Sequence, residues 1–295
     1  MIIVKLMGGM GNQMFQYAFG KQLALKHNVK LKLDLTEISN VNLNGNYSVR
    51  ELGLDNFNTD LTTATKEEIN EYKGTKISKL INLLLLYSPI KANRLYIREP
   101  YFHFFKKALI APKDAYLDGY WQSEKYFISV RSELIKDFTL KSKLSEESKL
   151  ISQNIEMQNS VSIHVRKGDY LSIASNQNLY EDCGPAYYKK SMEKIAGLVN
   201  DPVFYLFSDE PEWFKKNVST TFKVEFVTHN KGKDSYQDIY LMSLCKHNII
   251  ANSSFSWWGA WLNTYTDKIV IAPKKWFKND SKNSSDLIPE TWIRL

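Results

Sequence analysis

Residues 162–170 of the chain read SIHVRKGDY, and the pattern inside this stretch decides the fold. Apolar residues at 161, 163 and 165 alternate with polar ones, so a strand here would bury one face and carry His164 and Arg166 on the other. The strand then breaks at Lys167, Gly168 and Asp169. This is typical of the carboxyl end of a parallel strand, the edge at which open α/β sheets bind ligands. Two cations, an imidazole and a carboxylate suit an anionic ligand with a hydroxyl group to be activated.

The composition is that of a soluble globular protein. The 295 residues suffice for about two domains, and 43% hydrophobic with 24% charged residues is ordinary. A net charge of +7 admits an anionic small substrate, a membrane surface or nucleic acid as partner. Because the lysines are spread along the whole chain, we expect no nucleic-acid partner. The 13% of aromatic residues fits sugar or base stacking as well as large cores, and both interpretations stay open.

Cysteine usage and the first residues point to the cytoplasm. Cys183 and Cys245 lie far apart and show neither a disulfide framework nor metal-ligand spacing. Residues 2–6 begin a strand directly, without the pattern of a secretory signal peptide. A leucine-rich run at 76–89, flanked by basic residues, is too short to span a bilayer, which needs about 20 apolar residues. It predicts a core helix, with a helix at the inner face of a membrane as the alternative.

The order of expected elements favours an α/β protein of two domains, 1–155 and 156–295, divided within a charged segment. A strand, a glycine turn, a helix capped by Asn12 and a second strand make the opening β-α-β of a doubly wound sheet. The expected elements of the first domain are strands at 2–7, 30–34 and 115–121 and helices at 12–27, 64–73 and 124–138. Those of the second are strands at 160–166, 203–208, 223–227, 247–251 and 268–272 and helices at 185–199, 211–217, 235–245 and 254–264. This alternation predicts a parallel sheet covered on both faces.

A glycine loop follows the first strand. Gly9 and Gly11 let the backbone approach a ligand closely, and with Asn12 they stand at a helix N-terminus, which favours anions. The loop lacks the Gly-Lys-Ser/Thr of a Walker loop, and Met14 replaces the third glycine of a dinucleotide fingerprint. The functional interpretation is phosphate contact, and the alternative is a turn needed only for packing.

The groups after residue 163 could act on a phosphate. Arg166 can donate two parallel hydrogen bonds to it and stays charged throughout a reaction. Asp169 could pair with a neighbouring cation or accept a proton. The alternatives are a surface salt-bridge network for these groups and a half-buried histidine with satisfied hydrogen bonds for His164.

Two further strand ends carry polar residues. Asp209 ends an apolar strand and could bind a guanine edge or a ribose, or cap the helix that begins at Pro211. A serine-rich stretch follows the strand at 247–251 and opens a helix, where small hydroxyl residues and backbone N–H groups form a phosphate site without a lysine. Its members are Asn252, Ser253, Ser254, Phe255 and Ser256. The tryptophans that follow are interpreted as interior packing.

The chain contains no Asp-x-Asp pair, the close carboxylates that hold a nucleotide through a divalent metal. We therefore expect no divalent metal and no cofactor. Arginine and backbone amides would stabilise the leaving group instead.

The motifs together resemble the bacterial α-1,2-fucosyltransferases of glycosyltransferase family 11. They are GGMGNQMFQYA at 8–18, the HVRKGDY run, FSDE at 207–210 with Trp213, and NSSFSWWGA at 252–260. The resemblance implies a GT-B architecture, with two Rossmann-like domains facing a central cleft. It implies metal-independent, inverting transfer of L-fucose from GDP-β-L-fucose to the 2-hydroxyl of a terminal galactose. The first domain would serve the acceptor and the second would bind GDP-fucose.

The resemblance also suggests a role for each matching residue. Arg166 matches an arginine on the donor β-phosphate, and His164 a residue near the nucleotide. Gly11 and Asn12 match the loop that faces the pyrophosphate, and Asp209 a position near guanosine. The serine-rich stretch, with Ser254 and Ser256, matches a loop on the phosphates. Family members often carry a second arginine where Lys167 stands, so a forked contact is not expected there. Asp169 is the candidate base or acceptor-orienting residue.

Other interpretations stay open at this stage. A fucosyltransferase of another linkage would share the phosphate loops, and a non-catalytic glycan-binding protein would also use tryptophan and tyrosine. The acceptor could be lactose, a type-1 or type-2 chain or a lipid-linked O-antigen unit. Cytoplasmic location is expected, with peripheral contact at the inner face of the membrane left open, and the sequence predicts no oligomeric state.

Overall fold

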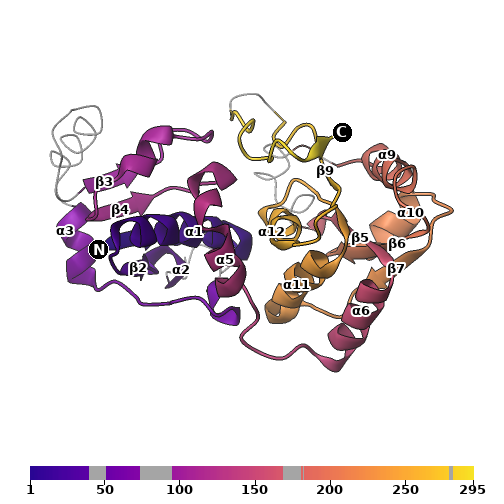
Figure 1. The fold of residues 1–295 in the computed structure, drawn as a ribbon, viewed down its shortest axis with the longest axis horizontal. Helices are drawn as coiled ribbons and strands as arrows, with labels where there is room; N and C mark the ends of the chain where they lie inside the picture. The colour runs from indigo at the N-terminus through magenta and orange to yellow at the C-terminus, as the bar shows by residue number, and fades with distance from the viewer. Residues whose placement is uncertain (40–50, 74–94, 169–180, 182, 279–281) are drawn as a thin grey trace. The chain divides into compact units, whose positions relative to one another are not determined.

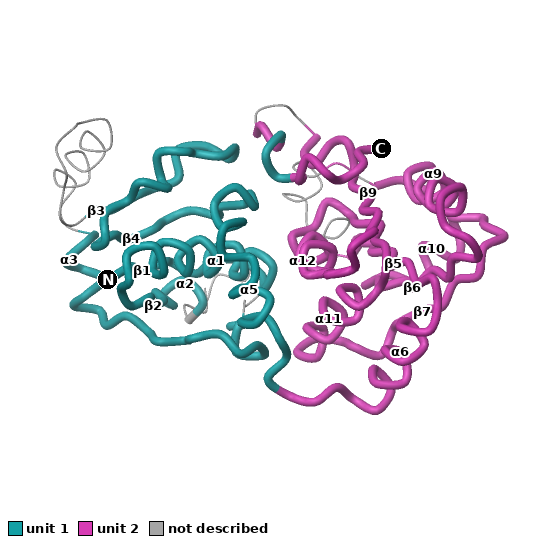
Figure 2. Tube along the Cα trace, viewed as in Figure 1, with its two compact units in different colours: residues 1–141, 285–287 teal, residues 142–284, 288–295 magenta. Residues whose placement is uncertain are grey.

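The computed structural model describes residues 1–39, 51–73, 95–168, 181, 183–278 and 282–295 (Figure 1). The chain folds into two compact units (Figure 2). Unit 1 is Met1–Lys141 with Ser285–Leu287, and unit 2 is Ser142–Ser284 with Ile288–Leu295. The boundary comes earlier than the predicted one after residue 155. The reason is that helix α6 (Glu146–Met157) packs against α11 (Tyr236–Leu244) and β5 (Asn159–Val165), all within unit 2.

Unit 1 holds a sheet of four parallel strands among its described residues, in the order β2-β1-β4-β3. The predicted β-α-β opening is confirmed. The predicted helix at 124–138 is instead broken into two 3₁₀ turns and a short helix, because the backbone leaves the helical region at Phe127, with a φ of −144°, and at Val130, with a φ of −118°. The elements are β1 (Ile2–Lys5), α1 (Met10–His27), β2 (Leu31–Asp34), α2 (Thr36–Ser39), η1 (Gly53–Asn56), α3 (Lys66–Lys73), β3 (Leu95–Arg98), η2 (Lys106–Ile110), β4 (Ala115–Asp118), η3 (Glu124–Tyr126), η4 (Ile128–Val130) and α5 (Arg131–Asp137).

Unit 2 holds a six-stranded parallel sheet in the order β10-β9-β8-β5-β6-β7, counted over its described residues. All five predicted strands are confirmed, and the two-residue β10 was too short to predict. Besides α6, β5 and α11, the elements are α9 (Pro185–Ala196), β6 (Pro202–Ser208), α10 (Pro211–Asn217), β7 (Val224–Val227), η5 (Gly232–Ser235), β8 (His247–Ile249), α12 (Ser254–Leu262), β9 (Val270–Ala272) and β10 (Ile293–Arg294).

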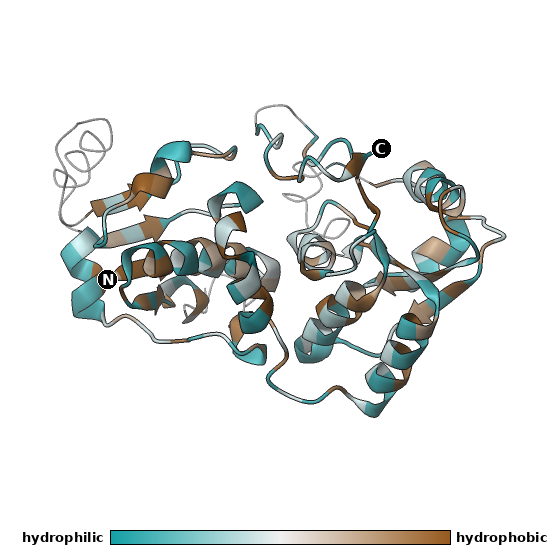
Figure 3. Ribbon diagram, in the orientation of Figure 1, coloured by the Kyte–Doolittle hydropathy of each residue, from teal (hydrophilic) through white to brown (hydrophobic). Residues whose placement is uncertain are grey.

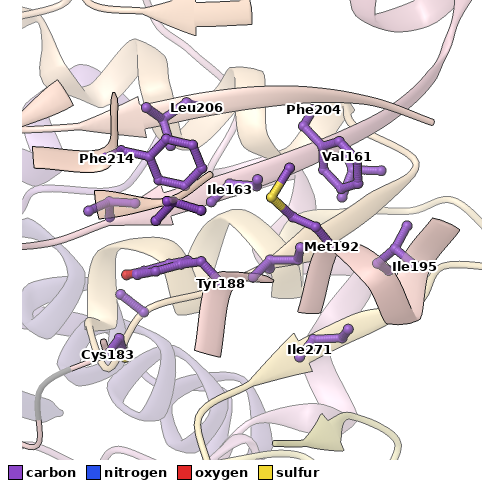
Figure 4. Packing of buried hydrophobic residues seen from close by; sticks show 14 residues of the cluster. Val161, Ile163, Cys183, Tyr188, Met192, Ile195, Phe204, Leu206, Phe214 and Ile271 are labelled. Carbon is purple, nitrogen blue, oxygen red and sulfur yellow. The ribbon is translucent and has the colours of Figure 1, made fainter. Parts of the chain in front are cut away.

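Strand β5 divides its side chains between the two faces of this sheet as predicted. Val161 and Ile163 join an apolar cluster with Tyr188 and Met192 of α9 and Phe214 of α10 (Figure 4). The alternate residues of β5 face the other layer, where Ser162 accepts a hydrogen bond from Asn248 and the His164 ring packs near Phe255. Helices α6 and α11 show hydrophilic and hydrophobic residues side by side, as expected of helices that cover a sheet (Figure 3).

The tryptophans of α12 lie in the interior, as predicted. Trp257 and Trp258 are fully buried and Trp261 nearly so. In the part of the chain that the structure describes, no helix is both long enough and apolar enough to cross a membrane. The leucine-rich run at 76–89 lies largely outside the described residues.

Candidate functional site

The candidate site lies where β5, β6 and β8 end at the carboxyl edge of the unit 2 sheet. The register pairs Val165, the last residue of β5, with Ser208, the last residue of β6. The residues that follow the two strands, Arg166 and Asp209, therefore lie side by side. Their side chains form a salt bridge of 3.1 Å between Nη1 and Oδ2, and both are partly exposed. This pairing of Arg166 with Asp209 was not predicted from the sequence.

Asp209 also binds the turn that follows β5. Its Oδ1 accepts the N–H of Lys167 at 3.0 Å, and its Oδ2 accepts the N–H of Gly168 at 3.0 Å. A Cβ atom on Gly168 would lie only 2.8 Å from Oδ2, which explains the glycine. Asp209 does not cap α10, whose N-cap is Glu210. The carboxylate instead holds the turn and Arg166 in place, and its contact with guanosine stays a prediction.

Lys167 points into the protein. Its side chain is only 1% exposed, its Nζ donates to the Cys183 carbonyl at 3.1 Å, and it lies 3.8 Å from the centroid of the Trp213 ring. A cation over an indole face in a desolvated site is a favourable contact. Lys167 therefore ties the end of β5 to α10 and the Cys183 segment, a role that the sequence did not reveal.

His164 lies on the face of β5 that meets α12. Its ring is 5% exposed and its centroid is 5.6 Å from that of Phe255. Burial, helped by the nearby charge of Arg166, lowers the pKa of His164 to about 3, so the ring is neutral near pH 7. Its Nδ1 is buried and has no hydrogen-bond partner among the described residues, so the interpretation as a satisfied histidine is wrong. A buried unpaired nitrogen is costly, and a ligand could pair it.

Helix α12 brings its N-terminus to the same edge. The first N–H groups of any helix have no partner within the helix and carry partial positive charge. Ser253 is the N-cap, its side chain makes no capping hydrogen bond, and the first turn carries no acidic residue. Ser254 and Phe255 are half-buried. This end of α12 is therefore suited to an anion.

Two of the predicted phosphate contacts are engaged inside the protein. Asn252 is 1% exposed, and its amide donates to the Trp276 carbonyl at 3.1 Å and to the Glu181 carbonyl. The Ser256 hydroxyl, also buried, donates to the carbonyl of Ser253 at 3.3 Å. These side chains shape the loop, so a ligand would meet the Ser254 hydroxyl and backbone amides instead.

The glycine loop belongs to unit 1, at the carboxyl end of β1. Gly9, not the predicted Asn12, is the N-cap of α1, because the helix already begins at Met10. Asn12 instead accepts a hydrogen bond of 2.7 Å from Gln122. Gly8 has a φ of +76°, a conformation that glycine adopts without strain. Gln13, which the sequence analysis did not single out, fixes the loop by donating to the Gly8 carbonyl at 3.0 Å.

Glu99, after β3, is another residue that sequence patterns did not reveal. It accepts the N–H groups of Tyr120 at 2.7 Å and Trp121 at 3.1 Å, and burial raises its pKa to about 7. It holds the turn after β4.

The candidate base Asp169 lies outside the described residues. Within the described ranges no group of three or more His, Cys, Asp or Glu side chains is placed to bind a metal, and metal independence stays a prediction.

A solved structure shares the fold of this chain. A mutant of Arabidopsis thaliana FUT1 in complex with GDP matches 91% of this chain and 69% of its own, with a TM-score of 0.51 at 11% identity. That likeness concerns the fold alone and agrees with the predicted α/β architecture of two Rossmann-like units, the GT-B type.

Relatives in sequence are more similar to this chain in identity. An alpha-1,2-colitosyltransferase of Escherichia coli is 35% identical over 299 residues, 100% of this chain and 98% of the relative. Galactoside 2-alpha-L-fucosyltransferase Sec1 of Mus musculus is 27% identical over 189 residues, 60% of this chain and 50% of the relative. The model of the family described as glycosyl transferase family 11 matches residues 1–295. Since that match spans every residue that carries the candidate site, the chain belongs to glycosyl transferase family 11 and is a glycosyltransferase.

Proposed function

We propose that this glycosyltransferase moves L-fucose from GDP-β-L-fucose to the 2-hydroxyl of a terminal galactose, with inversion at the anomeric carbon. The observation that carries the proposal is the strand-end arrangement of unit 2. Arg166 is held there by Asp209, at the same sheet edge as the unpaired Nδ1 of His164 and the N-terminus of α12. A permanent cation and helix amides at one edge suit a diphosphate.

The reaction is a single displacement. A bond forms between the acceptor oxygen and the anomeric carbon of fucose, while the bond from that carbon to the diphosphate oxygen breaks. Negative charge develops on the departing GDP, and Arg166 with the α12 amides would stabilise it where it develops. The acceptor hydroxyl proton passes to a general base, for which Asp169 is the candidate. No divalent metal is required in this scheme.

A second donor deserves a direct test because the Escherichia coli relative is named a colitosyltransferase. Colitose differs from fucose by lacking the 3-hydroxyl group. A site that binds this hydroxyl rejects the deoxy sugar strongly, whereas an apolar site discriminates weakly. The name of the mouse relative and the four motifs support fucose.

The deciding experiment offers the purified chain GDP-fucose or GDP-colitose with a panel of galactose-terminated acceptors, and determines the product linkage. The panel contains lactose, type-1 and type-2 disaccharides and a lipid-linked oligosaccharide. We expect α-1,2-fucosylated product, undiminished by excess EDTA. Exclusive use of GDP-colitose would overturn the donor, another linkage would overturn the acceptor position, and loss of activity in EDTA would overturn metal independence.

Calorimetric titration with GDP separates the enzyme from a glycan-binding protein. We expect GDP to bind wild-type protein and to bind Arg166→Ala more weakly, since the arginine supplies a charged contact to phosphate. A protein that binds glycans alone would not bind GDP. The proposal also places the reaction in the cytoplasm, where a membrane-linked acceptor would be met at the inner face of the membrane.

A further inference from the structure

An exposed surface on unit 1 combines aliphatic and basic side chains. Ile110, at the end of η2, is 74% exposed, and Leu25, in the last turns of α1, is 46% exposed. The two segments are joined, because Lys26 Nζ donates to the Leu109 carbonyl at 2.6 Å and the His27 ring lies 2.8 Å from the Ala111 carbonyl. We call this surface the Ile110 patch, and its members are Leu25, Lys26, Lys106, Lys107, Ile110 and Lys113.

The two segments that form the Ile110 patch carry charge of one sign. Residues 25–30 and 106–113 contain five lysines and no aspartate or glutamate, and the lysines are exposed. The next acidic residue, Asp114, accepts a hydrogen bond from the Tyr72 hydroxyl and so is turned to the protein. Like charges gathered around an exposed aliphatic tip repel one another, so as a group they do not favour folding. They are the complement of an anionic partner.

Helix α6 shows that exposure alone does not make such a surface. Leu150 and Met157 are 63% and 76% exposed, comparable with Ile110. Their surroundings on α6 are acidic, with Glu146 and Glu147 in its first turn and Glu156 in its last. The Ile110 patch is therefore distinguished by its lysines, and α6 supplies a matched control.

We propose that the Ile110 patch docks the protein on an anionic lipid bilayer. Lysine ammonium groups are attracted to anionic headgroups, and an aliphatic tip between them enters the boundary between headgroups and acyl chains. A nucleic acid would engage the lysines but would leave Ile110 in water. The lipid surface uses both parts of the patch, which favours it over a polyanion. This inference stands apart from the donor and acceptor of the proposed function.

The test is cosedimentation of the full chain with vesicles of phosphatidylcholine alone or mixed in equal parts with phosphatidylglycerol. We expect binding to the anionic vesicles only. Lys106→Gln with Lys107→Gln lowers the partition coefficient about 25-fold, at about fivefold for each charge. Ile110→Ser weakens binding and makes the remainder more sensitive to salt. Circular dichroism and thermal unfolding verify that each variant is folded.

Matched controls carry the same changes on unit 2. Lys149→Gln with Lys215→Gln removes two exposed charges, and Met157→Ser removes an exposed apolar side chain. Both controls are expected to bind as wild type does. The proposal is overturned if the wild type stays in the supernatant, or if patch and control variants bind alike. It is also overturned if Ile110→Ser has no effect and RNA displaces the protein, which would identify a nucleic-acid surface.

Discussion

The carboxyl edges of the two sheets carry similar polar residues, but these residues differ in whether they have hydrogen-bond partners within the protein. At the edge of unit 1, Asp34 accepts hydrogen bonds from Lys73 at 3.0 Å and from the Tyr116 hydroxyl, and Asp118 lies 3.6 Å from Lys5. At the edge of unit 2, Arg166 is paired with Asp209, but the buried Nδ1 of His164 has no hydrogen-bond partner among the residues that the structure describes. Carboxylates that are already paired leave little for a ligand to gain, whereas a buried nitrogen without a partner can still gain a hydrogen bond. The comparison indicates that these two carboxylates of the unit 1 edge stabilise the fold, while the unit 2 edge keeps a nitrogen that a ligand could pair.

The largest expected effect on the unit 2 edge comes from removing Arg166. Arg166→Ala is expected to lower kcat/KM for GDP-fucose by about 10²- to 10³-fold, the cost of losing one donor that stabilises developing negative charge. Arg166→Lys keeps the charge and loses the fork, so its loss should be smaller. Steady-state kinetics with the donor varied gives both values. Wild-type kcat/KM in Arg166→Ala would contradict the phosphate role.

Asp209→Asn tests whether the unit 2 edge needs the Asp209 carboxylate to hold Arg166 and the turn after β5. The variant cannot accept all three contacts that the carboxylate makes with Arg166, Lys167 and Gly168. We expect kcat/KM to fall by about 30-fold, or about 2 kcal/mol, within the range for hydrogen bonds to a charged group. The exposed Glu212→Gln on α10 is the control and should stay near wild type.

The double variant, Arg166→Ala with Asp209→Asn, shows whether Asp209 positions Arg166 or contacts the guanine base directly. If Asp209 acts by holding Arg166, then Asp209→Asn has little further effect once Arg166 is alanine, because interacting residues are not additive. Independent losses, together with reduced preference for GDP over IDP, would show that Asp209 contacts guanine instead. The prediction inferred from the family resemblance is then the correct one.

Sequence patterns predicted which strands end in polar residues, but not which contacts those residues make with one another. Alternation along β5 placed His164 on the face opposite Ile163 and Val165, and the structure confirms it because side chains alternate along a strand with a period of two. The contact of Arg166 with Asp209 depends on the register of β5 and β6, which local sequence does not encode. Asn252 and Ser256 looked like ligands because their residue types suit phosphate, yet their hydrogen bonds are internal.

Asp34→Asn tests the closed edge of unit 1. Burial opposes ionisation, but hydrogen bonds from Tyr116, Thr36 and Lys73 outweigh it and lower the pKa of Asp34 below its ordinary value. A carboxyl whose pKa is lowered by folding stabilises the fold above its unfolded pKa of about 3.9 and loses that effect as the pH falls through the folded pKa. We expect Asp34→Asn to cost about 1.5 kcal/mol at pH 7.

Urea unfolding at pH 7 and at pH 3 measures this cost, with donor binding unchanged. The difference between Asp34→Asn and wild type should shrink at the lower pH, because the stability that comes from the lowered pKa of Asp34 is lost as the pH falls below the unfolded value. Glu37→Gln, which removes an exposed partner of Lys5, is the control and should cost less. An equal loss of stability at both pH values would contradict the charged role of Asp34.

His164 gives the smallest effect and the sharpest distinction between the edges. Its folded pKa of about 3 lies below the value of about 6.5 in an unfolded chain, so the unfolded state binds a proton that the folded state refuses. Stability is therefore full above pH 6.5 and falls as the pH drops below it, by about 1 kcal/mol at pH 6. His164→Gln should remove this dependence, and the pH profiles of the urea midpoint for variant and wild type measure it. GDP should protect the wild type more than the variant if the ligand pairs Nδ1. Parallel profiles would show that folding does not lower the pKa of His164, and the neutral buried ring would then no longer distinguish the unit 2 edge from that of unit 1.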